Sequence, residues 1–451
     1  MKDYPNIIFI VFDTLRKDVL PIYGGNAITP NLNEFRKDAV VFSNAITPAS
    51  WTIPSHISFF TGLYPREHGV HEYFNEIKND FVHYESLMKQ KFDSKTITEK
   101  LKDKGYDTIG ISANPTIAPD TGFDKGFDYF EYIDSRYLSS SEINYGKKFF
   151  KNGKINIKNV LENYKEIPQL YKIYRKSRYL KKFYDYPSVK GANLTIDRLD
   201  NISFNKPFFI FFNFMEPHEP YIKWELRPPY PYKQPLFIHD LAGNKIPGRI
   251  MNMIKKTYIE NLNKLDFYFE KLIKYLKEVK EYENTMIIVT SDHGQALKEK
   301  NYYTHGLFLY NEIIEIPLIV KFPNSEKIIV KEGHQSLTYL PELITNVSEG
   351  NIIDITRESV FSESFGFMYN LYDILKDKNK VEKMKNMYGH PRKAIYKNNY
   401  KLVVSGLGGE IEEFTFKGKK LAPNENKNVL DDLIDELEIF KGTDSFVVRK
   451  K

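Results

Sequence analysis

Three short, strongly apolar runs constrain this fold more than any other feature of the sequence. They are NIIFIVF, PFFIFFNFM and TMIIVT, which begin at residues 6, 207 and 285. β-branched and aromatic runs of this length, bounded by proline or polar residues, are typical of strands buried on both faces. Helical patterns separate them, including a long amphipathic pattern over residues 254–280. Strands that alternate with helices predict an α/β fold with a mainly parallel sheet sandwiched by helices.

The sequence changes in texture after residue 350. SVFSES, RKAIYKNNYKLVVSG and EIEEFTF are typical of short antiparallel strands, and KNVLDDLIDELEIF predicts a closing helix. At 451 residues the chain is long enough for one large domain with a smaller one appended. We therefore predict a large domain over residues 1–350 and a C-terminal α+β subdomain over residues 351–451.

The composition excludes several classes of function. The chain has no cysteine, which rules out disulfides, thiolate catalysis and cysteine metal sites. Its longest apolar runs fall well short of the roughly 20 residues that cross a bilayer. The N-terminus also lacks the cleavage site of a signal peptide. We therefore expect a cytoplasmic protein with no transmembrane segment, and the sequence leaves its oligomeric state unknown.

Positive charge is concentrated in residues 141–190, which hold 13 Lys and Arg against 4 Asp and Glu. This stretch belongs to a basic, tyrosine-rich insertion over residues 131–200. One interpretation is contact with a polyanion or with anionic lipid headgroups. The other is a solvated helical hairpin in a lysine-rich protein. The sequence leaves both open.

Polar residues follow directly on the buried strands. Asp13 ends the first strand, His218 follows the second in MEPHEP, and Asp292 and His293 follow the third in SDHG. In open parallel sheets, ligand sites lie beyond the carboxyl ends of the strands. Carboxylate and imidazole groups bind divalent cations. Asp13, Asp292 and His293 therefore predict a metal site, and the alternative for SDHG is a turn with a capping aspartate.

Thr52 is the candidate nucleophile. It lies in PASWTIPSHISFFTGLYPREHGV, residues 48–70, just before the expected helix SHISFFTGLY. A helix N-terminus presents free N–H groups that favour an anionic phosphoryl or sulfuryl group. Coordination to a cation would also lower the pKa of the hydroxyl. We therefore expect Thr52 to act as nucleophile and metal ligand, and the alternative is a simple helix cap.

The order of these motifs resembles the sulfatase-like branch of the alkaline phosphatase superfamily. The landmarks are NIIFIVFDTLR, TPNLNEF, FSNAITPASWTIPSHISFFTGLYPREHGV, GISANP, GFDKGFDYF, FIFFNFMEPHEPY, IIVTSDHG and IPLIV, which span about residues 4–345. The resemblance implies an alkaline phosphatase-like fold and a metal-dependent ester hydrolase. It places metal ligands on Asp13, Asp292 and His293, and the nucleophile on Thr52.

Two departures from the family pattern affect the expected chemistry. Sulfatases carry a cysteine or serine at the position of Thr52, which becomes formylglycine, and threonine cannot form that aldehyde. We therefore expect no formylglycine, and a threonine ester cleaved by a second in-line attack, which favours phosphorus over sulfur. Asp13-Thr14 and Asp292-His293 also offer fewer carboxylates than a calcium site. One manganese or zinc ion is expected, with magnesium, iron or calcium as alternatives.

Further site residues are expected from the same resemblance. His305, in YYTHGLFLYNE, and His218 match positions near the leaving group and the transferred group, where either could protonate the departing oxygen. Three more residues are expected to bind substrate oxygens: His56, Asn114 and Arg16. The alternative for His305 and His218 is a hydrogen bond to a loop, without a catalytic role. The alternative for His56 is to orient Thr52, and the alternative for Arg16 is an ion pair with a neighbouring acid.

These inferences predict a hydrolase of phosphate diesters, or of phosphonate or phosphate monoesters, acting through a covalent threonine intermediate. One alternative is a sulfatase that works without formylglycine. Another is a phospho-group transferase acting on a glycan or lipid, because both reactions share the first step. A non-catalytic anion-binding protein is the third. The sequence does not identify the organic part of the substrate.

Overall fold

The computed structural model describes residues 4–70, 95–133, 190–199, 207–221, 246–325, 333–367, 377–406, 408–442 and 446–448, together with two short strands, β6 (Phe150–Lys151) and β7 (Lys154–Ile155). The basic segment over residues 141–190 therefore lies almost entirely outside the described residues. No helix within the described ranges is both long and apolar enough to cross a membrane.

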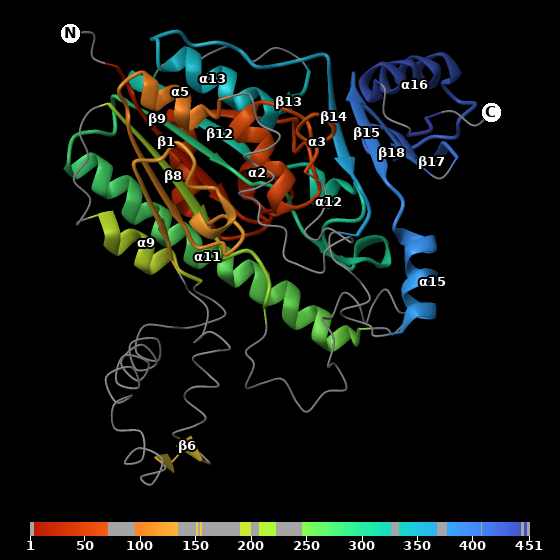
Figure 1. The fold of residues 1–451 in the computed structure, drawn as a ribbon, viewed down its shortest axis with the longest axis horizontal. Coiled ribbons are helices and arrows are strands. Elements are labelled where there is room, and N and C mark those ends of the chain that lie inside the picture. The colour runs from red at the N-terminus through yellow and green to blue at the C-terminus, as the bar shows by residue number, and fades with distance from the viewer. Residues whose placement is uncertain are drawn as a thin grey trace.

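A seven-stranded sheet, in the order β2-β12-β9-β1-β8-β4-β5, forms the centre of the larger domain (Figure 1). Five neighbouring strands run parallel: β9 (Thr285–Thr290), β1 (Asn6–Phe12), β8 (Phe208–Phe214), β4 (Asp107–Ser112) and β5 (Tyr129–Tyr132). Strand β12 (Leu318–Lys321) is antiparallel to β9 and to β2 (Val40–Phe42). The predicted mainly parallel sheet is confirmed, and the three apolar runs are its central strands.

The central strands are buried on both faces because helices cover each side of the sheet. On one side Ile8 and Ile10 of β1 join a core with α1 (Pro30–Phe35), α9 (Ala192–Leu199) and α11 (Gly248–Glu278). On the other side Ile7 and Phe9 pack with α2 (Thr52–Thr61), α5 (Ile97–Asp103) and α13 (Leu340–Val347). Alternate residues of a strand point to opposite faces, so an unbroken apolar run suits this position.

The C-terminal part forms a five-stranded antiparallel sheet, as predicted. Its strands are β14 (Ser359–Ser364), β15 (Arg392–Lys397), β16 (Tyr400–Ser405), β17 (Glu410–Phe416) and β18 (Lys419–Lys420). The closing helix α16 (Lys427–Lys441) packs Leu433 and Leu437 against it, and α15 (Lys378–Tyr388) precedes β15. The boundary at residues 350/351 stays a prediction.

Short elements connect these layers. They are α3 (Pro65–His68), α12 (Asn311–Ile314), the pair β3 (Ala45–Ile46) and β13 (Gln335–Ser336), and the hairpin β10 (Ala296–Leu297) and β11 (Tyr303–Thr304).

Strand β14 ties the C-terminal sheet to the segment before α2. The Glu363 N–H donates to the carbonyl oxygen of Pro48 at 2.9 Å, and Glu363 forms a parallel bridge with Ala49. The Glu363 carboxylate is buried, where it pairs with the Lys393 ammonium and accepts from the Arg66 N–H at 2.9 Å. The C-terminal sheet therefore braces the segment that carries Thr52.

Candidate active site

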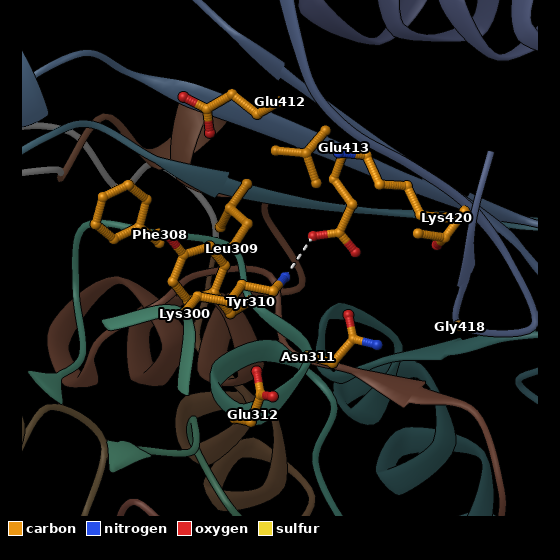
Figure 2. Close-up of a pocket in the computed structure, with 12 residues that line it drawn as sticks. Lys300, Phe308, Leu309, Tyr310, Asn311, Glu312, Glu412, Glu413, Gly418 and Lys420 are labelled. Atoms are coloured by element: carbon orange, nitrogen blue, oxygen red, sulfur yellow. Dashed lines mark hydrogen bonds and ion pairs between the residues drawn. The ribbon is translucent and has the colours of Figure 1, made fainter. Parts of the chain in front are cut away.

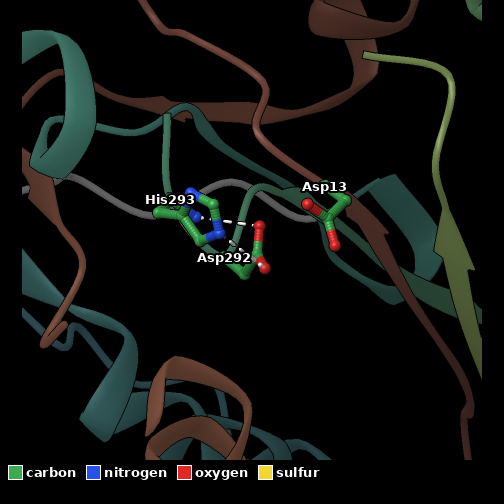
Figure 3. A group of neighbouring side chains, drawn as sticks. All are labelled: Asp13, Asp292 and His293. Atoms are coloured by element: carbon green, nitrogen blue, oxygen red, sulfur yellow. Dashed lines mark hydrogen bonds and ion pairs between the residues drawn. The ribbon is translucent and has the colours of Figure 1, made fainter. Parts of the chain in front are cut away.

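Asp13, Asp292 and His293 meet at the carboxyl ends of β1 and β9 (Figure 3). One ligand atom from each residue lies within 4.8 Å of the other two, and all three side chains are fully buried. Backbone N–H groups orient Asp292, because its Oδ1 accepts from Thr14 at 3.2 Å and from His293 at 2.9 Å. Two adjacent parallel strands thus bring together residues far apart in the sequence.

The donor set fits a divalent metal ion. Asp13 Oδ1 and Asp292 Oδ2 are buried, and neither has a hydrogen-bond partner within the described part of the chain. Burial and the nearby charge of Asp292 raise the pKa of Asp13 well above its ordinary value. Carboxylate oxygens in such surroundings are costly unless a cation pairs with them. Two carboxylates and an imidazole would hold a metal such as manganese, zinc, magnesium or iron.

Thr52 is the first residue of α2, so this helix begins three residues earlier than the predicted SHISFFTGLY. Its Oγ1 lies 3.2 Å from His293 Nε2. Trp51 occupies the N-cap position, so the alternative that Thr52 merely caps the helix does not hold. The hydroxyl instead faces a proposed metal ligand at a helix N-terminus, where the backbone N–H groups favour an anion.

His56 lies behind Thr52. Its Nδ1 donates to the carbonyl oxygen of Thr52 at 2.8 Å, and its Nε2 accepts from Asn213 Nδ2 at 2.9 Å. Burial lowers the pKa of His56 to about 4, although Asp292 lies nearby. Because both ring nitrogens are engaged and the side chain is fully buried, His56 is not placed to bind substrate oxygens. The arrangement fits the alternative, orientation of Thr52.

The other two expected substrate-binding residues are also held by protein partners. Asn114 Nδ2 donates to Asp13 Oδ2 at 2.6 Å, which places Asn114 as a support for a proposed metal ligand. The Arg16 guanidinium, 7% exposed, pairs with Asp18 at 2.7 Å and Glu299 at 2.9 Å. Arg16 therefore forms ion pairs with neighbouring acids, which was the alternative to substrate binding.

His218 and His305 do lie beside the proposed metal site. The His305 ring centroid is 4.3 Å from that of His293 and 5.4 Å from that of His218. Burial lowers the pKa of His218 to about 4 and that of His305 well below its ordinary value. His305 Nδ1 lies 2.6 Å from Oε1 of Gln295. Both histidines were expected near the leaving group and the transferred group, and their positions beside His293 fit that expectation. Their catalytic roles stay predictions.

Sequence reasoning missed Lys190. Its buried ammonium donates to the carbonyl oxygens of Glu216, at 2.7 Å, and of His218. The Glu216 carboxylate accepts from the backbone N–H groups of Lys190 and Ala192, at 2.7 and 2.9 Å. Burial lowers the pKa of Lys190 to about 7. Lys190 thus anchors the loop that carries His218, and it precedes a helix rather than following a strand, so the strand-end pattern could not find it.

The sequence analysis also did not single out Gln295, whose Oε1 contacts His305. Its position directly after Asp292, His293 and Gly294 was the one available sign that it lies at the site.

A cleft of about 580 Å³ lies between the chain after His305 and the C-terminal sheet (Figure 2). The predicted site residues are not among those described as lining it. Phe308 and Tyr310 stack on each other there, with ring centroids 4.8 Å apart. Arg392 and Lys300 lie over these two rings, at 4.5 and 4.4 Å. Of these two cations, Lys300 itself lines the cleft, so the ring of Tyr310 is already covered by a positive charge there.

The sequence model of the sulfatase family matches residues 5–345. The chain belongs to the sulfatase family. This confirms the resemblance drawn from the motifs and the alkaline phosphatase-like fold. Members of this superfamily bind a divalent metal ion, and the group of Asp13, Asp292 and His293 could hold one in this chain.

Curated relatives support the same assignment. A sulfatase of Formosa agariphila is 26% identical over 359 residues, which cover 72% of this chain and 65% of that protein. An N-acetylglucosamine-6-O-sulfatase of Bacteroides thetaiotaomicron is 23% identical over 381 residues, which cover 72% and 64%. The match thus spans slightly less than two thirds of the length of these two relatives.

Solved structures share the fold over almost the whole chain. The phosphonate monoester hydrolase of Silicibacter pomeroyi superposes with a TM-score of 0.64 at 16% identity, covering 97% of this chain and 95% of that one. A sulfatase-like protein of Bacteroides thetaiotaomicron gives 0.65 at 16% identity, covering 97% and 92%.

Proposed function

We propose that this chain is a metal-dependent hydrolase of anionic esters that uses Thr52 as a covalent nucleophile and prefers phosphorus substrates, namely phosphonate or phosphate monoesters or phosphodiesters. The observation that carries the proposal is the 3.2 Å separation of Thr52 Oγ1 and His293 Nε2 at the start of α2. The proposal is supported because a hydroxyl, a helix N-terminus and a proposed metal ligand lie close together. Such an arrangement suits attack on a bound tetrahedral anion.

The reaction would proceed in two in-line displacements. Thr52 gives up its hydroxyl hydrogen and forms an Oγ1–P bond while the bond from phosphorus to the leaving oxygen breaks, and the leaving oxygen departs with a hydrogen as the alcohol. The product is a threonine ester of the phosphoryl or phosphonyl group, called phosphothreonine below. Water then attacks phosphorus from the opposite side, its OH stays on phosphorus, the bond to Thr52 Oγ1 breaks, and the second hydrogen of the water restores the hydroxyl. A bound cation would neutralise charge on the transferred group and lower the pKa of the hydroxyl. The proximity of His305 to His293 and of His218 to His305 supports a proposed role for both histidines at the oxygens that leave and attack.

Phosphorus is preferred because of the chemistry of threonine. A formylglycine hydrate can expel sulfate by elimination from carbon, and threonine has no such route. Its ester must be cleaved by a second attack at the transferred group. A neighbour in fold, the phosphonate monoester hydrolase, acts on the substrate class that its name gives.

A sulfatase is the second candidate function, and the family match favours it. One neighbour in fold was solved with its substrate D-glucosamine-2-N,6-O-disulfate. A sulfated sugar is therefore the reference substrate for this alternative.

The test compares matched aryl phosphate, phosphodiester, phosphonate and sulfate esters after metal removal and return of manganese or zinc. Thr52→Val removes the hydroxyl and keeps the side-chain shape. Thr61→Val, at the other end of α2, is the matched control, because Thr61 Oγ1 donates to Ile57 O at 2.7 Å within the helix. The proposal expects metal-dependent cleavage of phosphorus esters that only Thr52→Val abolishes. Preferred cleavage of the sulfate would support the sulfatase and contradict the preference for phosphorus.

A further inference from the structure

We infer that Gln295 is a positioning residue that fixes His305 in one tautomer, with the hydrogen on Nδ1 and a lone pair on Nε2. The inference deepens the proposed function and rests on it for the identity of the site. Gln295 is fully buried and His305 is 6% exposed. The 2.6 Å contact between Gln295 Oε1 and His305 Nδ1 is therefore shielded from water.

The tautomer follows from the chemistry of the two groups. A carboxamide oxygen only accepts hydrogen bonds, so the ring nitrogen facing it must donate. A neutral imidazole carries one ring hydrogen, so Nε2 of His305 is then an acceptor. No described residue forms a hydrogen bond with that nitrogen. His305 is thus prepared to receive a hydrogen from a substrate hydroxyl or from water.

The two neighbouring imidazoles have the same arrangement. His293 Nδ1 lies 2.8 Å from the carbonyl oxygen of Gly294, and His218 Nδ1 lies 2.7 Å from that of Glu219. Backbone carbonyl oxygens are acceptors as well, so these two rings also carry their hydrogen on Nδ1 when neutral. The Gln295 side chain thus provides His305 Nδ1 with a hydrogen-bond acceptor, as backbone carbonyl oxygens do for Nδ1 of His293 and of His218. An outer partner of this kind is what orients imidazoles in metal sites.

The role differs from that of a proton donor to the leaving group. A neutral His305 held by Gln295 has no hydrogen on Nε2 to give. It accepts instead, which suits contact with the water that attacks the phosphothreonine. Reversal of the Gln295 carboxamide would exchange its oxygen and nitrogen and put the hydrogen of His305 on Nε2. The two arrangements therefore predict opposite tautomers.

Nuclear magnetic resonance of the full chain labelled with ¹⁵N-histidine distinguishes the two tautomers of His305. Long-range proton–nitrogen correlations identify the protonated ring nitrogen, and His305→Asn assigns the signal by its loss. We expect hydrogen on Nδ1 in the wild type and in Gln295→Glu, whose carboxylate also accepts. Gln295→Met keeps the side-chain length without an acceptor, and should shift the hydrogen towards Nε2. Hydrogen on Nε2 in the wild type, or an unchanged Nδ1 signal in Gln295→Met, would overturn the inference.

Kinetics on the best substrate found supply the second readout. Gln295→Met should lower kcat by about 10- to 100-fold, the range for outer partners of functional histidines, with a smaller effect on KM. Gln295→Glu should recover most of the loss. Gln295→Met should add no further loss to His305→Asn, since both act through one ring. Independent, additive losses would contradict the inference. The resonance measurement needs no activity, so it decides the tautomer even where the proposed function fails.

Discussion

The substitution Asp13→Asn should change the stability of this protein in opposite directions with and without metal. In the metal-free protein two buried carboxylates face each other without a cation, so removal of one charge should stabilise the fold. With metal bound, the same substitution removes a ligand and should destabilise the fold relative to the wild type. This reversal of sign is specific to a metal site.

The distances in the site set the magnitude. At 4.8 Å, the upper limit for the separation of the ligand atoms, two like charges repel by about 3.5 kcal/mol at an effective dielectric constant of 20. The raised pKa of Asp13 lets a proton relieve part of this repulsion. Because the ligand atoms lie no farther apart than this, about 3.5 kcal/mol is a lower limit for the repulsion between two full charges, and with partial protonation of Asp13 we expect a gain of about 2–3 kcal/mol in the metal-free state. Metal at about 1,000 times its Kd should stabilise the wild type by about 4 kcal/mol.

Urea unfolding followed by circular dichroism measures both effects, once in chelator and once in manganese or zinc. Asp266→Asn is the matched control. Asp266 is buried as well, but its carboxylate accepts from the N–H groups of Asn31 and Leu32, at 3.0 and 2.8 Å. Its substitution should cost stability equally in both conditions.

One result would refute this account of the site. If Asp13→Asn lowered the free energy of unfolding by the same amount in chelator and in metal, the carboxylate would be a structural group like Asp266. Metal-independent stability of the wild type would lead to the same conclusion. Neither result depends on finding the substrate.

Three further predictions concern other buried charges. Burial lowers the pKa of His334 to about 4, so as pH falls below about 6.5 the unfolded chain binds the proton first and the folded state loses stability. The wild type should therefore lose up to about 3 kcal/mol more unfolding free energy between pH 7 and pH 4 than His334→Asn does. The same pH dependence of the unfolding free energy in both proteins would contradict this. Glu363→Gln should cost about 3–5 kcal/mol because it removes the carboxylate that pairs with the buried Lys393 ammonium, and urea unfolding should show that adding Lys393→Met recovers most of the loss. Lys190→Met should lower kcat at least about 10-fold by freeing the loop that carries His218, with metal binding unchanged; wild-type kinetics would exclude this role.

The central sheet was predictable because its strands are apolar on both faces. A run such as NIIFIVF fits few other environments, and Asp13 at its end is placed by the strand itself. Asp292 and His293 follow from the same rule, since the carboxyl ends of adjacent parallel strands meet at one edge. The start of α2 was less certain in the sequence, because Pro54 fits the first turn of a helix as well as a preceding loop.

The supporting contacts were not predictable, because they depend on pairs that only the folded chain brings together. His56 was expected at the substrate, yet its ring contacts Asn213 near the carboxyl end of β8. Nothing in the spacing of these two residues signals that contact. Arg16 could equally have faced the substrate or Glu299, and the choice depends on the turn that follows Gln295. Side-chain direction, rather than element type, is what the sequence left open.

The brace on the Thr52 segment has a consequence for how the protein matures. Ser50 and Ser364 both donate to the carbonyl oxygen of Gly306, at 2.9 and 3.0 Å, and Glu363 holds Pro48. Thr52 is synthesised early, and strand β14 leaves the ribosome late. A nascent chain therefore carries Thr52, the proposed nucleophile, long before these contacts can form. The segment that carries Thr52 gains this brace only after β14 has been made, so the contacts that hold the proposed site are complete only late in synthesis.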